Sequence, residues 1–137
     1  MGDNVIDYIL KKDDNKLYIA ENNFYSVVDS TIQKYINQLL LKRLNNLSAL
    51  EKSTRKLFGF KNKIPLFISR EILLLCIMSY RMNMSVYLNY FAISKYEEIE
   101  GKLIVYFYSG HCYACESSYA FYNQIKKAQK MMELLLK

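Results

Sequence analysis

The sequence predicts an α+β fold in which an antiparallel sheet is covered by helices, with an amphipathic helix at the C-terminus. Two stretches carry apolar residues at the three-and-four spacing of a helix face, whereas most other apolar runs are short and rich in β-branched and aromatic residues. The helices and strands do not alternate as βαβ units would, which argues against a parallel sheet. The 137 residues, 52% of them hydrophobic, can bury a core, and we expect residues 1–137 to form a single domain.

The N-terminal part is predicted to contain a hairpin followed by a helix. Residues 5–10 and 16–20 are β-prone runs on either side of Lys-Lys-Asp-Asp-Asn at 11–15, in which Asp and Asn tolerate turn geometry. Between Thr31 and Leu44, apolar side chains recur on one helix face and polar side chains on the other. The apolar face consists of Ile32, Tyr35, Ile36, Leu39, Leu40 and Leu44.

A second, shorter helix is predicted from Ala49 to about Phe58. Ser48 and Glu51 have the spacing of a capping box, in which each side chain accepts a hydrogen bond from the backbone N–H of the other residue. Gly59 follows at the position where a left-handed residue often ends a helix, which supports this end point.

Four further strands are predicted from short apolar and aromatic runs. They are residues 65–68, 72–78, 86–93 and 103–108. Pro65 cannot donate a hydrogen bond to a neighbouring strand, so the first of these runs is predicted to be an edge or the start of a strand. The carboxylates of Glu97, Glu98 and Glu100 are predicted to lie in a solvated turn, and Ser109-Gly110 marks another turn.

The C-terminal helix is predicted to begin at Ser117 or Ser118. Its apolar stripe has alternating four- and three-residue spacing, and consists of Phe121, Ile125, Ala128, Met132 and Leu135. Lys126, Lys127 and Lys130 lie off that stripe, so the helix has a basic flank.

Positive charge is concentrated in the middle of the chain. The net charge is +6, but residues 26–70 alone contain nine basic and two acidic residues, a net charge of +7. Such an excess is typical of proteins that bind a polyanion, because each phosphate neutralised by Lys or Arg releases counterions. A solvated basic face that serves only solubility is the alternative. The candidate DNA-binding residues are Lys42, Arg43, Lys52, Arg55, Lys56, Lys61, Lys63, Arg70, Lys126, Lys127 and Lys130.

The cysteines permit two other interpretations. Cys112 and Cys115 form a CxxC motif between a predicted strand and a predicted helix, as in thiol oxidoreductases, although too few residues follow for that fold. A zinc site would need His111 and Cys76 in addition, but one CxxC is weak evidence, and Cys76 lies in an apolar run typical of a core. A hairpin that carries two structural cysteines is the simpler interpretation.

No arrangement of residues predicts an enzyme. The sequence has no glycine-rich phosphate loop, and its one histidine has no nucleophile and carboxylate at a recognised spacing. We therefore expect no catalysis, no cofactor, no bound metal and no small-molecule substrate. The longest apolar run, residues 72–78, is too short to span a bilayer, and the first 25 residues do not resemble a signal peptide, so we expect a cytoplasmic protein without membrane contact.

Several segments, read in order, resemble the bacterial competence transcription factor family ComK. They are Ser53-Thr-Arg-Lys-Leu-Phe-Gly59, Asn62-Lys-Ile-Pro-Leu-Phe-Ile68, the apolar and aromatic strands around residues 72–78 and Tyr87, the strand that closes on Gly110, and Ser117-Ser-Tyr-Ala-Phe-Tyr-Asn-Gln-Ile125. The last segment is the most specific, with a serine, a phenylalanine four residues later and an Asn-Gln pair. Tyr87 stands where the family usually has tryptophan, and the chain is shorter between Gly59 and Pro65, so it resembles a divergent, short member.

The resemblance implies a non-enzymatic regulator that binds paired A/T-rich promoter boxes, largely through the minor groove of double-stranded DNA, and activates DNA-uptake genes. Paired boxes favour a homo-oligomer, because symmetric protomers can each bind one box. Arg55 is the candidate for insertion into the minor groove, since it lies in the family-like segment. An interaction protein of the same family that does not bind DNA, and a thiol or zinc protein centred on Cys112 and Cys115, are the alternatives.

Overall fold

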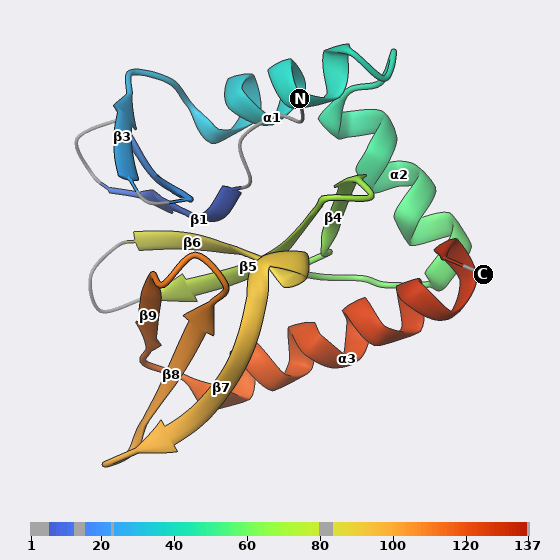
Figure 1. The fold of residues 1–137 in the computed structure, drawn as a ribbon. Helices are drawn as coiled ribbons and strands as arrows, with labels where there is room; N and C mark the ends of the chain where they lie inside the picture. Colours follow the sequence, from blue (N-terminus) through green and yellow to red (C-terminus); the bar gives the residue numbers. More distant parts are fainter. Residues whose placement is uncertain (1–5, 13–15, 23, 80–83, 137) are drawn as a thin grey trace.

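The computed structural model describes residues 6–12, 16–22, 24–79 and 84–136, and Figure 1 labels its helices and strands. The elements are β1 (Ile6–Lys11), β2 (Leu17–Glu21), β3 (Phe24–Val28), α1 (Ile32–Leu41), α2 (Leu47–Phe58), β4 (Leu66–Ser69), β5 (Ile72–Ser79), β6 (Met84–Asn89), the short 3-10 helix η1 (Tyr90–Ala92), β7 (Ile93–Ile99), β8 (Lys102–Phe107), β9 (Cys112–Cys115) and α3 (Ser118–Leu135). The arrangement is α+β with antiparallel sheets and a C-terminal helix, as the sequence predicts. In these ranges no helix combines the length and apolar character needed to cross a membrane.

The larger sheet has six antiparallel strands in the order β3-β2-β1-β6-β5-β4. The predicted N-terminal hairpin forms its β1–β2 pair, and β3 adds a strand that was not predicted from the sequence. Residues 5 and 13–15 of the predicted hairpin lie outside the described residues. β1 and β6 pair at the centre of the sheet, whereas β4, which follows Pro65, lies at its edge as predicted.

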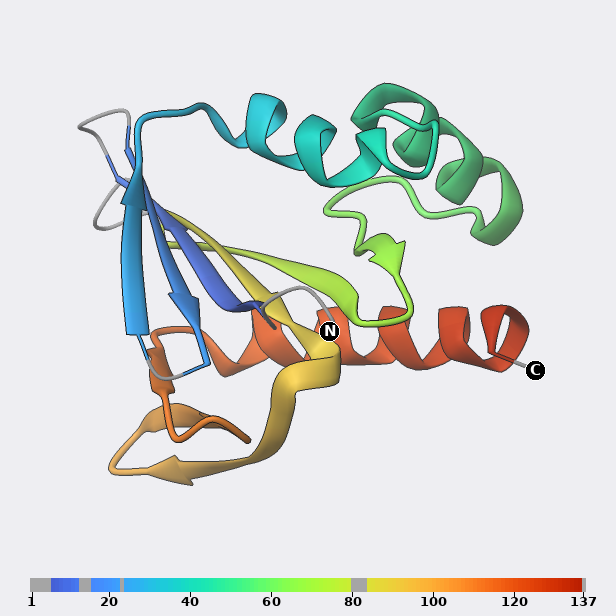
Figure 2. The same ribbon diagram turned by 45° about the horizontal axis from the view of Figure 1, so that its top comes forward.

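Helices cover both faces of this sheet. Alternate residues of β5 point to opposite faces, so Leu74 packs in one core with Ile36 of α1, and Leu73 and Leu75 pack in the other with Phe121 of α3. The three-stranded sheet, with the order β7-β8-β9, contributes its buried residues to the second core. Figure 2 shows α1 and α2 on one side of the large sheet, with α3 and the small sheet on the other.

The first helix is confirmed, but it is shorter than predicted. Thr31 caps its N-terminus, because the Oγ1 atom accepts a hydrogen bond from the backbone N–H of Lys34 at 3.2 Å. The prediction that Leu44 belongs to the apolar face was wrong, since α1 ends at Leu41 and the Leu44 side chain is 95% exposed. Leu44 has a φ of +55°, and a residue in this left-handed conformation cannot continue a helix.

The second helix is also confirmed, but a different residue caps it. The Asn46 Oδ1 atom accepts a hydrogen bond from the backbone N–H of Ala49 at 2.9 Å, so α2 begins at Leu47. The predicted capping box of Ser48 and Glu51 was therefore wrong. Asn46 has extended backbone angles and lies one residue before the helix, which is the geometry of a cap, whereas Ser48 already lies within the first turn.

The predicted strand over residues 86–93 is interrupted. Its first part belongs to β6 and its last residue to β7, with η1 between them. The Asn89 side chain causes the break, because its Oδ1 atom accepts a hydrogen bond from the backbone N–H of Phe91 at 3.2 Å and so caps η1. The chain passes at this point from the large sheet to the small one.

The acidic segment after η1 is mostly a strand rather than the predicted turn. Glu97 and Glu98 are exposed residues of β7, where they pair with β8, and only Glu100 lies in the turn. This prediction was wrong because the exposed positions of an edge strand carry carboxylates as readily as a turn does.

The C-terminal helix is confirmed, with Ser117 as its cap. The Ser117 Oγ atom accepts a hydrogen bond from the backbone N–H of Ala120 at 3.3 Å. The first three residues of the predicted stripe, from Phe121 to Ala128, are buried, and Met132 and Leu135 are partly buried against the same core. Gln124 and Met131 are buried as well, so the buried face of α3 is wider than the predicted stripe.

Candidate nucleic-acid interface

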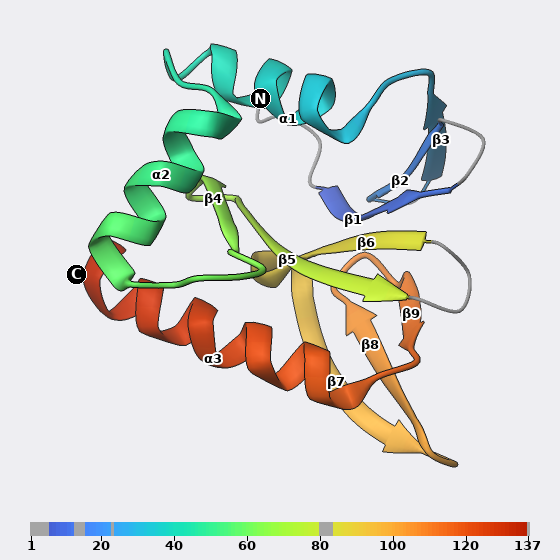
Figure 3. The same cartoon turned by 180° about the vertical axis from the view of Figure 1, so that it is seen from behind.

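The basic flank of α3 lies against the segment that follows α2. Lys126, Lys127 and Lys130 share one side of α3, because residues three and four apart lie on the same helix face. The Lys127 Nζ atom donates hydrogen bonds to the carbonyl oxygens of Asn62, at 2.6 Å, and Lys63, at 3.3 Å. Figures 1 and 3 show the end of α2 beside the C-terminal half of α3. The fold therefore brings together two basic segments that are far apart in the sequence.

A turn at the end of α2 positions two phenylalanines at this junction. Gly59 has a φ of +74°, a left-handed conformation that glycine adopts without strain, so α2 ends where the sequence predicts. The rings of Phe58 and Phe60 stack on each other with their centroids 5.6 Å apart. The ammonium groups of Lys127 and Lys130 lie 5.5 and 5.8 Å from the Phe60 centroid, within the range of cation–π attraction.

Gln124 holds the same segment from inside the protein. Its side chain is buried, its Oε1 atom accepts a hydrogen bond from the Cys76 N–H at 2.9 Å, and its Nε2 atom donates one to the Lys63 carbonyl at 2.6 Å. β4 pairs with β5 only as far as Leu74. The backbone N–H of Cys76 therefore donates its hydrogen bond to the side-chain amide of Gln124 rather than to a residue of β4. Gln124 thus links α3, β5 and the 59–63 segment.

The basic residues of α2 adjoin this junction. Lys52, Arg55 and Lys56 are exposed and share one side of α2 by the same helical spacing. Arg55 and Lys63 both line a cavity of about 340 Å³ between the helices and the sheet, together with Glu51. We refer to the eight residues around this junction as the basic surface: Lys52, Arg55, Lys56, Lys61, Lys63, Lys126, Lys127 and Lys130.

The positive charges of the basic surface lie close enough to affect one another. Partial burial lowers the pKa of Lys127, and the neighbouring charge of Lys63 lowers it further. A phosphate bound here would offset that repulsion, because an anion favours the charged form of both ammonium groups.

Three of the eleven candidate residues lie elsewhere. Lys42 and Arg43, at the end of α1, line a separate cavity of about 280 Å³ with Glu21 and Ser69. Arg70 is exposed in the turn between β4 and β5. Charge counts along the chain cannot separate these residues from the other eight, since the separation depends on how α1 and α2 pack.

The structure does not place the cysteines as a redox or zinc site requires. Cys112 and Cys115 lie within β9, which pairs with β8, rather than at the N-terminus of a helix. Residues three apart in a strand point to opposite faces, so Cys112 is exposed while Cys115 is buried. Cys76 lies in the larger sheet. Over the described ranges, no three His, Cys, Asp or Glu side chains gather where they could hold a metal ion.

We expect the free energy of unfolding to fall with rising alkalinity. Burial raises the pKa of Cys115 from 9.0 to about 12 and that of Tyr113 from 10.0 to about 12. Both groups are neutral in the folded protein, so their contribution is complete below the ordinary pKa and is lost as the pH rises towards 12. Urea denaturation at about pH 8, 9.5 and 11 measures this loss. The Cys115→Ala variant should lose less free energy of unfolding than the unaltered protein between about pH 8 and 9.5. An identical pH dependence in both proteins would contradict the raised pKa of Cys115.

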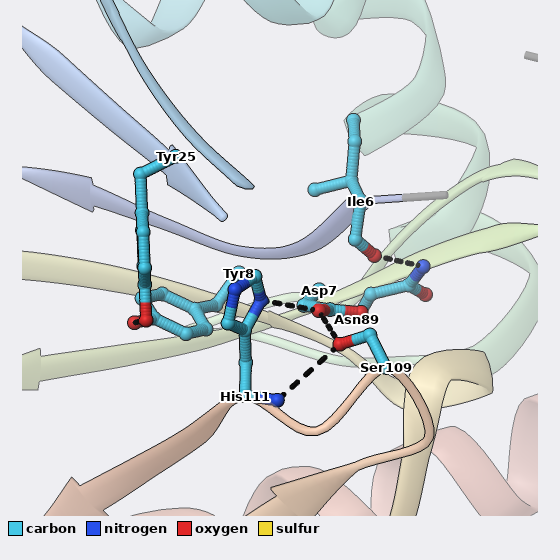
Figure 4. Close-up of polar contacts among 7 residues, drawn as sticks. All are labelled: Ile6, Asp7, Tyr8, Tyr25, Asn89, Ser109 and His111. Carbon is cyan, nitrogen blue, oxygen red and sulfur yellow. Dashed lines mark hydrogen bonds and ion pairs between the residues drawn. The ribbon is translucent and has the colours of Figure 1, made fainter. Parts of the chain in front are cut away.

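A polar cluster that the sequence analysis missed joins β1 to the turn between β8 and β9 (Figure 4). Asp7 is buried in β1, and its Oδ2 atom accepts a hydrogen bond from the Ser109 Oγ atom. The His111 Nδ1 atom lies 2.8 Å from the same oxygen. The His111 ring also packs beside Tyr25 of β3, with the ring centroids 4.5 Å apart, and beside Tyr8.

The cluster contains the residue types of a hydrolytic triad without its geometry. In a triad the histidine lies between the serine and the carboxylate, whereas here Asp7 contacts both Ser109 and His111 directly. We therefore assign it a structural role as a connection between strands. Ser109 and His111 are 102 and 104 residues from Asp7, so no local motif predicts the cluster. The one feature of the sequence that could have indicated it is the carboxylate of Asp7 within an apolar, β-prone run.

Comparison with known proteins identifies one family. A model of the ComK family, described as ComK protein, matches residues 6–137 of the chain. The match runs from β1 to the end of α3 and includes every residue of the basic surface. No curated protein and no solved structure matches the chain.

Proposed function

Since this chain belongs to the ComK family of competence-related transcription factors, we propose that it binds double-stranded DNA through the basic surface. In this proposal the protein is a single DNA-binding domain of residues 1–137 that acts in the cytoplasm as a homo-oligomer. It binds paired A/T-rich promoter boxes and activates DNA-uptake genes, without catalysing a reaction. The observation that carries the proposal is the junction of three basic segments, in which Lys127 of α3 binds the carbonyls of Asn62 and Lys63, and Lys63 lines a cavity with Arg55 of α2.

The chemistry of the basic surface suits a DNA backbone. Seven of its eight side chains are exposed, and the eighth, Lys127, is partly buried. Each interaction between such a side chain and a phosphate releases condensed counterions, so the affinity for DNA falls as the salt concentration rises. These interactions orient the protein on the duplex but do not distinguish sequences.

A preference for A/T-rich boxes needs a further interaction, for which Arg55 is the candidate. The minor groove of A-tracts is narrow and has an enhanced negative potential that attracts an inserted arginine. Arg55 lies in the last turns of α2 and borders the cavity that Lys63 also lines. Its replacement should therefore weaken binding to A/T-rich duplexes more than to G/C-rich duplexes.

The triple variant Arg55→Ala, Lys56→Ala and Lys61→Ala is expected to bind all duplexes more weakly. The slope of log K against log salt should become shallower by about 0.9 for each phosphate that the variant no longer neutralises. Fluorescence anisotropy with A/T-rich and G/C-rich duplexes over a salt series measures both quantities.

The matched control removes three positive charges from the opposite side of the molecule. Lys12 follows β1, Lys16 precedes β2 and Lys102 begins β8, and these strand ends lie away from α2 and the end of α3 (Figure 1). Their triple alanine variant should retain the affinity and the salt slope. Equal losses in both variants would show that net charge, rather than the basic surface, governs binding. Absence of DNA binding by the unaltered protein at low salt would instead favour the alternative, an interaction protein of the same family that does not bind DNA.

A further inference from the structure

The outermost strand of the large sheet, β3, has an uncharged and partly apolar surface. It has the sequence Phe-Tyr-Ser-Val-Val, and Phe24, Tyr25 and Val27 are 47%, 62% and 56% exposed. β3 pairs with β2 on one side only, so its other edge is the end of the sheet in the part of the chain that the structure describes. An edge strand of this kind offers backbone N–H and C=O groups to another strand.

The other three terminal strands have features that discourage such pairing. β4 and β9 have only four residues each, and β4 directly follows Pro65. β7 carries charged side chains at Lys95, Glu97 and Glu98. Proteins commonly protect sheet edges with short strands, proline and charges. β3 has no proline and no charged residue, and it is one residue longer than β4 and β9. The contrast marks β3 as the edge that is open to a partner.

We propose that a second copy of this chain pairs with β3, edge to edge and antiparallel, about a two-fold axis at Ser26. This register uses all five residues of the strand. It places Phe24 opposite Val28 of the second copy and Tyr25 opposite Val27, so every flanking pair combines an aromatic with a β-branched side chain. Such cross-strand pairs stabilise antiparallel sheets. The strand is thus complementary to itself in a single register.

The surrounding structure supports this interface. Ser26 pairs with Ile19, which belongs to one core, and Tyr25 pairs with Ala20, which belongs to the other. Phe24 lies on the same face as Ser26, so Phe24 and Tyr25 extend opposite faces of the sheet. The Tyr25 ring is held beside His111, as Figure 4 shows, so it is ordered before a partner binds. β3 also lies on the opposite side of the molecule from the basic surface (Figure 1). Pairing at β3 therefore keeps the positive charges of the two copies apart.

This inference specifies the interface of the homo-oligomer proposed above, and it rests on that part of the proposed function. Sedimentation velocity without DNA should show a concentration-dependent dimer that Ser26→Lys abolishes, because the two-fold axis places the two new positive charges directly opposite each other. Leu41→Lys adds the same charge at an exposed residue of α1 and should leave the dimer intact. A wild-type protein that remains monomeric, or a dimer unaffected by Ser26→Lys, would overturn the proposed interface.

Cysteine cross-linking tests the register. Directly opposite residues of an antiparallel pair have Cα atoms about 4.5–5.5 Å apart, which a disulfide can bridge. In a Cys112→Ser background, mild oxidation should therefore cross-link Ser26→Cys into a covalent dimer but not Phe24→Cys, which faces residue 28 of the partner. A dimer that forms without this cross-link would refute the β3 interface while leaving the homo-oligomer in place. DNA binding is measured separately, so its loss would not be mistaken for either result.

Discussion

Replacing Asn89 by leucine is expected to lower the free energy of unfolding by about 3–6 kcal/mol, enough to unfold many domains of this size. Asn89 is completely buried, and both ends of its amide are used. Its Oδ1 atom accepts hydrogen bonds from the backbone N–H groups of Leu73, at 3.0 Å, and Phe91, at 3.2 Å. Its Nδ2 atom donates to the carbonyl oxygens of Ile6, at 2.7 Å, and Glu71, at 2.9 Å. Leucine would leave these backbone groups without their partner.

Urea denaturation followed by circular dichroism measures this effect. Asn89→Asp retains the two accepted hydrogen bonds but cannot donate as the amide does, so it should also be destabilised. Asn123→Leu is the matched control, because Asn123 is exposed on α3 and its replacement should change stability by less than about 0.5 kcal/mol. Equal stability of the Asn89 and Asn123 variants would show that the four hydrogen bonds do not stabilise the fold.

Replacing Gln124 by leucine should affect both stability and DNA binding. The substitution would leave the N–H of Cys76 without its partner and the carbonyl of Lys63 with only the longer hydrogen bond from Lys127, at a cost of about 1–4 kcal/mol. Since Gln124 holds the 59–63 segment against α3, the basic surface should also lose its arrangement. Affinity for DNA should therefore fall even at temperatures where the variant remains folded.

The control for Gln124 is Gln129→Leu, which changes an exposed glutamine on the same helix. Chemical denaturation and anisotropy titrations should be run on both variants, with circular dichroism to define the folded range. If folded Gln124→Leu binds DNA as tightly as Gln129→Leu, the 59–63 segment is not needed for binding. If both variants are equally stable, the buried amide does not stabilise the fold.

Local patterns were sufficient to predict the helices and most of the strands. The apolar spacing of α1 and α3 is repeated over several turns, and Gly59 ends α2 as expected. Some errors were local, such as the choice of Ser48 rather than Asn46 as the cap of α2, but others arose where tertiary contacts decide the conformation. The break after β6 depends on Asn89, whose partners include a carbonyl 83 residues away, and no local pattern reveals that hydrogen bond.

The sequence could predict which basic residues are candidates for the site, but not how they are arranged in space. Charge along the sequence indicated which Lys and Arg residues to consider, but it could not show that Lys127 meets Asn62, 65 residues away, or that Lys42 lies apart. In the sequence alone, the Asn-Gln pair of α3 is only a mark of family resemblance. The structure supplies a physical reason for Gln124, which satisfies backbone groups on two other segments.

The central pairing of β1 with β6 has a consequence for protein synthesis. Residues 8–11 pair with residues 85–88, so β1 cannot obtain its second neighbour until most of the chain has left the ribosome. At about 5–20 residues per second, translation of the intervening segment takes roughly 4–15 seconds. During that interval the nascent hairpin exposes what will become the middle of the sheet. We expect ribosome-bound chains that stop before residue 85 to be the most dependent on chaperones.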